Sequence, residues 1–133
     1  MSAGQKLLND LKIKSVYEGV LKIYLLLIIA IGFEVTGTLF MGVSDGFSKV
    51  GPTIVVFLCY LIALILSIII LKRMEIGYFN AIWSGVGTIL VILLGILLFN
   101  ESINFLKLLG IASIIIGILL LNLRTYKKES EVI

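Results

Sequence analysis

The residues from Ile23 to Met41, IYLLLIIAIGFEVTGTLFM, form a long apolar run that contains one acidic side chain, Glu34. At about 1.5 Å of rise per residue, this run is just long enough to cross a bilayer core of about 30 Å, and Glu34 lies roughly halfway along it. A carboxylate at that depth is costly unless it faces protein, water or a counter-charge. We therefore interpret Glu34 as a functional residue that points away from lipid.

Small residues accompany Glu34 on its own helix face. Ala30 precedes it by one turn, Gly37 and Thr38 follow it by one turn, and Met41 follows by two. Small side chains let a second helix approach closely, so this face is predicted to meet protein. The opposite face carries the residues that we expect to meet lipid: Leu25, Ile28, Ile29, Val35 and Leu39.

The composition of the whole chain indicates an integral membrane protein. Of its 133 residues, 60% are hydrophobic and only 14% are charged, which is far from the average for a soluble domain. The apolar runs are continuous in Leu, Ile and Val and do not alternate, so helices are favoured over the strands of a barrel. We predict an all-α membrane protein with four transmembrane helices, at about residues 23–42, 52–71, 76–98 and 105–123.

Two charged segments flank this transmembrane domain of residues 23–123. Residues 1–22 form a basic extension in which Leu7, Leu8 and Leu11 stand near lysines. Two interpretations stay open: a weakly amphipathic helix on the membrane surface, or a mobile tail or mispredicted start. The first apolar run is too long for a signal peptide and contains an acid, so cleavage is not expected. Residues 124–133 are predicted to be a charged tail.

The second and fourth spans each carry a feature that is weighed in two ways. Tyr60 falls near mid-membrane in the second span, where it either packs with a hydrogen-bonded hydroxyl or lines the same cavity as Glu34. In the fourth span, Gly110, Ser113 and Gly117 share one face without an ionisable group. We interpret that face as a packing surface for self-association, because four helices alone form a thin bundle.

The third span contains the second informative stretch, GYFNAIWSGVGT. Trp83 lies some seven residues inside the span, whereas an interface anchor belongs at its edge. An aromatic face near a membrane carboxylate is what a desolvated organic cation requires. The two glycines Gly85 and Gly87 make a hinge possible. Polar, small and aromatic residues recur here at helical spacing: Asn80, Trp83, Ser84, Gly87 and Thr88.

The residue inventory excludes several classes of function. The chain has no His and one Cys, Cys59, so neither an internal disulfide nor a His/Cys metal cluster can form. One membrane acid without a partner group offers no catalytic pair, so we expect neither an enzyme nor a cofactor. The net charge of +3 comes mostly from the termini, which favours contact with lipid over contact with nucleic acid.

The basic residues also predict an orientation. Nine of the eleven Lys and Arg lie in the N-terminal extension, in the KRME loop or after the fourth span, which leaves Lys49 and Lys107 for the other side. The positive-inside rule therefore places both termini in the cytoplasm. This bias suits a chain of fixed orientation better than one that inserts both ways.

Several motifs together resemble the small multidrug resistance family of bacterial and archaeal transporters, over about residues 23–123. They are E-V-x-G-T at 34–38, S-D-G-F at 44–47, C-Y at 59–60, A-I-W-S-G-V-G at 81–87 and the glycine-spaced fourth span. The resemblance implies proton-coupled export of lipophilic or guanidinium-like cations across the cell membrane by an antiparallel dimer. It also implies that Glu34 binds protons and substrate in turn, with Tyr60, Trp83 and Ser84 lining the pocket. The G-T after the glutamate is similar to the drug-exporting, quaternary-cation branch.

The chain departs from the family pattern at three places. Gly42 stands where relatives usually have Lys, and Gly51-Pro52 replaces a common Trp-Pro. Asn80 stands where a tyrosine is usual, so one aromatic wall of the implied pocket is missing. These departures and the charge bias support a second hypothesis, a non-autonomous subunit of a heterodimeric small transporter; the antiparallel homodimer remains the leading one.

Overall fold

The computed structural model describes the backbone of residues 3–132 and the side chains of residues 3–124. Within that part of the chain it contains helices and turns but no strand, which confirms the predicted all-α class. The helices are α1 (Ala3–Val43), α2 (Val50–Leu71), α3 (Ile76–Phe99) and α4 (Phe105–Val132). Each of the four contains a stretch long and apolar enough to cross a membrane.

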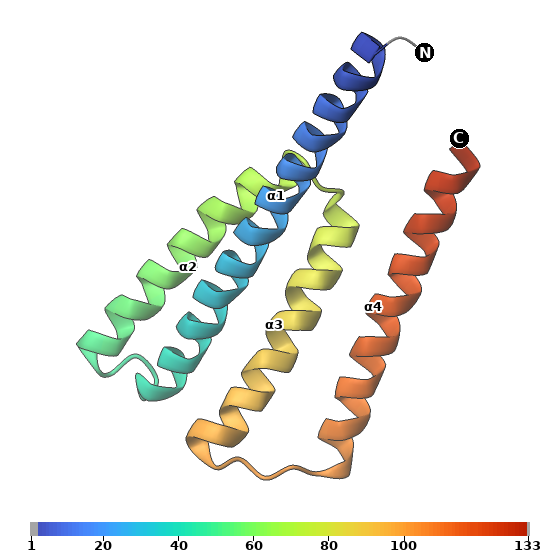
Figure 1. The fold of residues 1–133 in the computed structure, drawn as a ribbon. Helices are drawn as coiled ribbons and strands as arrows, with labels where there is room; N and C mark the ends of the chain where they lie inside the picture. The colour runs from blue at the N-terminus through green and yellow to red at the C-terminus, as the bar shows by residue number, and fades with distance from the viewer. Residues whose placement is uncertain (1–2, 133) are drawn as a thin grey trace.

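The helix bounds agree with the predicted spans except at the two ends of the chain. The basic extension does not form a separate element, because α1 runs without a break from Ala3 and projects beyond the bundle (Figure 1). α4 likewise continues past the apolar run to Val132. That the basic extension of residues 1–22 lies on a membrane surface stays a prediction. The N- and C-termini and the α2–α3 connection lie at one end of the molecule (Figure 1).

Short connections fold the chain into two antiparallel hairpins. After α1, the buried Ser44 accepts a hydrogen bond from the Phe47 backbone N–H at 3.2 Å and donates its hydroxyl to the Met41 carbonyl at 2.7 Å. The backbone then takes positive φ at Asp45 (53°), Gly46 (65°) and Phe47 (67°), which reverses its direction. Before α4, Asn104 accepts a hydrogen bond from the Lys107 backbone N–H at 2.8 Å and so satisfies a free donor of the first turn.

The core lies where α1 packs against both α2 and α3. It consists of Leu27, Ala30, Ile31, Val35, Ile70 and Phe79. α4 packs mainly against α3, at Gly85, where an added Cβ would collide with the side chain of Ile118. In the described part of α4, the apolar stretch Phe105–Arg124 contains no buried residue.

The prediction that one face of α1 meets lipid was wrong for Val35, which is buried, and holds only in part for Leu39, which is half-buried. Val35 is 4% exposed and belongs to the core, and Leu39 is half-buried against it. Both lie inside because α1 has two neighbouring helices, so its buried arc is wider than the single face around Glu34. Ile28 and Ile29 are exposed as predicted.

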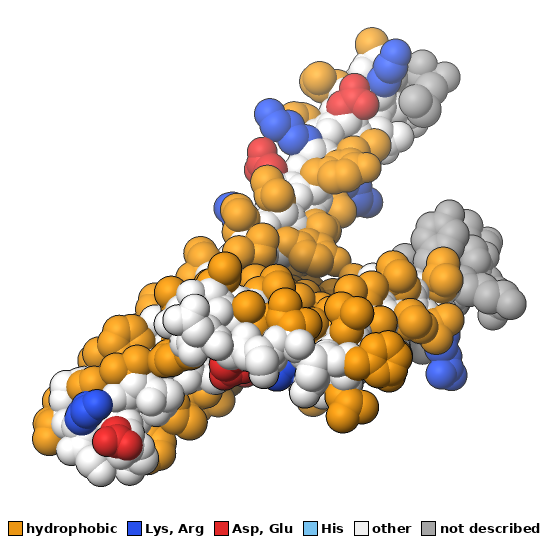
Figure 2. All heavy atoms as spheres, turned by 90° about the horizontal axis from the view of Figure 1, so that it is seen from below, with side chains coloured by type: hydrophobic (Ala, Val, Ile, Leu, Met, Phe, Trp, Pro, Cys, Tyr) orange, Lys and Arg blue, Asp and Glu red, His pale blue; other side chains and the backbone are white. Residues whose placement is uncertain are grey.

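The surface separates apolar from charged side chains. Apolar side chains cover the bundle, whereas charged side chains gather on the extension and near the helix ends (Figure 2). The large exposed apolar side chains of α2, such as Phe57 and Leu61, would be unfavourable in water and suit a lipid environment. This distribution is that of a membrane-spanning bundle.

Candidate functional site

Glu34 lies in the middle of the apolar part of α1 and faces α3. Its side chain is half-buried, and its Oε2 atom is buried with no hydrogen-bond partner among the residues that the structure describes. Gly87 of α3 faces this oxygen without a side chain, and an added Cβ there would stand 3.4 Å from Oε2. Gly87 therefore makes room for the carboxyl group; a role in a hinge, for Gly87 or for Gly85, stays a prediction.

Trp83 contributes the aromatic part of the site. Its side chain lies beside the Glu34 carboxyl group. The indole also contacts the ring of Phe79, with ring centroids 4.9 Å apart and an interplanar angle of 51°. Phe79 is itself part of the core, so the indole is fixed in position beside the carboxyl group.

Tyr60 approaches the site through Thr38, a connection that the sequence analysis missed. The Thr38 hydroxyl donates to the backbone carbonyl of Glu34 at 3.0 Å, and the Tyr60 hydroxyl lies 2.9 Å from the same Thr38 oxygen. Close packing accompanies this bond, since a Cβ at Gly37 would stand 3.2 Å from the Tyr60 ring. Tyr60 thus has the hydrogen-bonded hydroxyl of the first interpretation, and its role in lining a cavity stays a prediction.

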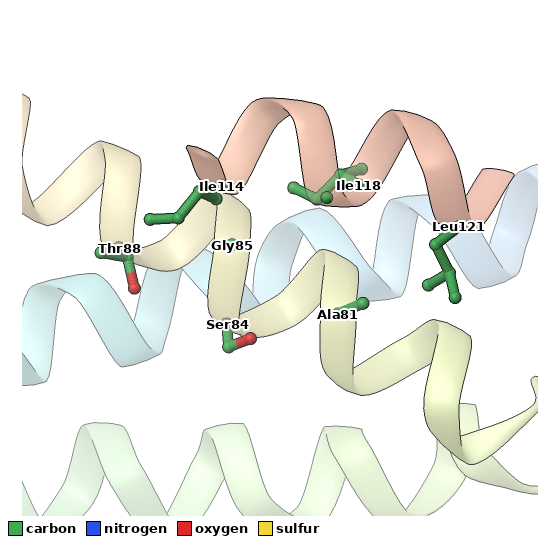
Figure 3. A pocket seen from close by; sticks show the side chains of 8 residues that line it. Ala81, Ser84, Gly85, Thr88, Ile114, Ile118 and Leu121 are labelled. Atoms are coloured by element: carbon green, nitrogen blue, oxygen red, sulfur yellow. The ribbon is translucent and has the colours of Figure 1, made fainter. Parts of the chain in front are cut away.

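Ser84 and Asn80 are not brought to the carboxyl group within one chain. The Ser84 hydroxyl donates to the Asn80 carbonyl at 2.7 Å, and both side chains are exposed. Ser84 follows Trp83 by one residue, and one residue turns a helix by about 100°. It therefore lines the groove of about 360 Å³ between α3 and α4, together with Thr88 and Ile118 (Figure 3). Asn80 borders a separate hollow of about 470 Å³ beside the end of α2.

The small residues of α4 form an open face. Gly110, Ser113 and Gly117 are all exposed, and the Ser113 hydroxyl donates to the Leu109 carbonyl of its own helix at 2.8 Å. The hydroxyl of Ser113 therefore already has a hydrogen-bond partner and needs none from a second helix. Its predicted use as a dimer interface is not tested by a single chain.

The arrangement suits reversible binding of a positive charge. An acidic side chain with an unpartnered oxygen stands in apolar surroundings, next to an indole and one helical turn from a hydroxyl pair. A proton on the carboxyl group, or a cation beside it, would each neutralise the charge there. Among the described residues no three His, Cys, Asp or Glu side chains gather as metal ligands.

Comparison with known proteins gives matches over most of the chain. The sequence profile of the Small Multidrug Resistance protein family matches residues 22–114. The quaternary ammonium compound-resistance protein QacH of Staphylococcus saprophyticus is 36% identical over 74% of this chain and 92% of its own length. The nicotine metabolites export pump subunit NepA of Paenarthrobacter nicotinovorans is 38% identical over 78% and 90%. An uncharacterized membrane protein of Bacillus subtilis, YvaE, is 35% identical over 81% and 91%.

These matches cover the spans that carry Glu34, Tyr60 and Trp83, and they extend over nearly the whole length of the relatives. Together with four membrane-spanning helices around one intramembrane carboxyl group, they show that the chain is a multi-pass cell-membrane protein that belongs to the small multidrug resistance family.

Proposed function

We propose that this protein exports lipophilic, quaternary ammonium-like cations in exchange for protons, and that Glu34 binds the proton and the cation in turn. One observation carries the proposal: a carboxyl oxygen without a hydrogen-bond partner is buried at mid-span beside an aromatic ring. The names of relatives that confer resistance to quaternary ammonium compounds or to many drugs support the cation class.

Exchange follows from the cost of leaving Glu34 charged and alone. In a low-dielectric setting the carboxylate is stabilised either by a proton or by a cation with little bound water. A quaternary ammonium ion has no hydrogen to donate, so it relies on charge and on the face of the indole. Because one carboxylate cannot hold both, binding of one releases the other, which couples the two fluxes. A rocking movement around this midplane site would then expose it to each side in turn.

The working unit that we propose is an antiparallel dimer. The open α4 face of Gly110, Ser113 and Gly117 favours close helix packing with a second chain. Ser84 and Asn80 point away from Glu34 within the chain, and a second copy could bring such residues to the pocket. A heterodimer is the second candidate, because the basic residues concentrate at one end and one relative is named a pump subunit.

Reconstitution tests the proposal and separates the two kinds of dimer. We expect the purified chain alone, in proteoliposomes with an outward-directed gradient of tetrabutylammonium, to move protons inward in proportion to the cation that leaves. Liposomes without protein are the control. Proton flux that appears only after a second small transporter is added would favour the subunit hypothesis, and cation flux without proton flux would contradict antiport.

Asn80 is expected to influence which cations are exported. If the amide leaves room that a tyrosine ring fills in relatives, Asn80→Tyr should narrow or shift the range of exported cations and leave Glu34-dependent proton binding nearly unchanged. The measurement is a panel of quaternary ammonium ions of increasing size in the proteoliposome assay. The control is Gln5→Tyr, which adds the same ring in the basic extension at the start of α1, outside the predicted span of residues 23–42. An identical profile for Asn80→Tyr and the wild type would remove Asn80 from the pocket.

A further inference from the structure

The helices that carry Glu34 and Trp83, α1 and α3, are joined a second time near the end of the bundle that holds both termini. There the hydroxyl of Tyr24 lies 3.3 Å from the hydroxyl of Tyr78. Tyr24 lies two residues after Lys22, and Tyr78 is the third residue of α3, five residues after Arg73. The pair therefore stands where the bundle meets the membrane edge. The proposed exchange does not use either hydroxyl.

The pair has a short structural path to the site. Tyr78 directly precedes Phe79, which is buried in the core and whose ring contacts the Trp83 ring at a tilt of 51°. If Tyr78 moved away from α1, the turn of α3 that carries Phe79 and Trp83 would therefore move with it, and the indole would shift relative to Glu34. Tyr24 is 40% exposed and Tyr78 is half-buried, so the bond lies at the margin of the α1–α3 contact, where the helices can part first.

The other end of the α1–α3 contact is held differently. Gly42 lies next to the ring of Phe99, and an added Cβ there would stand 3.6 Å from the ring atom Cζ. This is ordinary apolar contact without direction. One end of the contact thus has a directional hydrogen bond, and the opposite end has a ring against a glycine.

We infer that Tyr78 is a positioning residue: through its bond to Tyr24 it holds α1 and α3 together at the terminal end and closes that side of the Glu34 site. The inference rests on the proposed function, because closing one side matters only if the site opens to each side in turn. An interhelical hydrogen bond in a membrane protein shifts such an equilibrium by roughly threefold on average. Loss of the Tyr78 hydroxyl should therefore raise the ratio of open to closed molecules about threefold.

The test is a distance measurement between α1 and α3 that needs no transport. Spin labels are attached at Lys22→Cys and Glu75→Cys, both at exposed positions, in a Cys59→Ala background, and the distance distribution is recorded in lipid. We expect Tyr78→Phe and Tyr24→Phe each to enrich the longer distances by the same factor. The double variant should match either single variant, because both remove one bond.

The controls separate the bond from general loosening. Tyr17→Phe removes the same hydroxyl from an exposed ring on the extension of α1 and should leave the distribution unchanged. Unchanged distances in Tyr78→Phe, or additive effects in the double variant, would overturn the inference. The distances do not depend on coupled transport, so a failure of antiport in the reconstitution assay would be seen separately from a failure of the tyrosine pair.

Discussion

Glu34→Gln is expected to abolish cation-driven proton flux in proteoliposomes. Glutamine has nearly the same shape as glutamate, so the space beside Gly87 stays filled, but the amide neither binds a proton in this pH range nor carries charge. Removing one partner of a desolvated charge pair costs about 2–5 kcal/mol, which corresponds to at least a roughly thirtyfold loss of cation affinity. Coupling should be lost completely, because no other acidic residue stands between the ends of the four spans.

The matched control for this substitution is Glu101→Gln. Glu101 lies in the connection between α3 and α4 and pairs with Lys107 at 2.7 Å, with both side chains partly exposed. An exposed ion pair contributes little, so transport and binding should persist in this variant. A proton flux driven by the cation gradient in Glu34→Gln would contradict the proposal that Glu34 binds the exchanged proton.

The fold was accessible from the sequence because a membrane imposes a simple rule. The length of an apolar run reports the thickness of the bilayer, and all four runs became helices. The same rule does not predict where a helix ends outside the membrane, because there water can form the hydrogen bonds of backbone N–H and C=O groups that a helix would otherwise form. The sequence of the basic extension is therefore compatible with either a helix or a mobile tail, and the structure shows a helix that is continuous from Ala3.

The site was only partly accessible, for a geometric reason. Glu34 and Trp83 were paired because each is out of place at mid-membrane, and the structure brings them together. Helical spacing grouped Ser84 with Trp83, yet neighbouring residues on a helix differ in direction by about 100°, and only packing decides which of them faces α1. The role of Gly87 as the space for a carboxyl group depends on the facing helix, which no single-helix pattern contains.

Trp83→Ala is expected to weaken binding of tetrabutylammonium by up to about thirtyfold. A desolvated cation gains up to about 2 kcal/mol from an indole face, and this ion has no hydrogen-bond donor that could replace the gain elsewhere. Trp83→Phe keeps a ring face and loses the polar N–H beside Glu34, so it separates the contribution of the ring from that of the N–H. We expect this variant to recover most of the affinity.

Equilibrium dialysis with radiolabelled tetrabutylammonium measures all these variants in the same way, including those that lack the single tryptophan of the chain. Phe57→Ala deletes an aromatic ring of α2 that is 67% exposed, and its affinity should equal that of the wild type. Wild-type affinity in Trp83→Ala would remove the indole from cation recognition. An equal loss of affinity in Phe57→Ala would show that the loss arises from disturbance of the bundle, because this ring lies outside the site. The contribution of the indole to binding is therefore the difference in affinity between Trp83→Ala and Phe57→Ala.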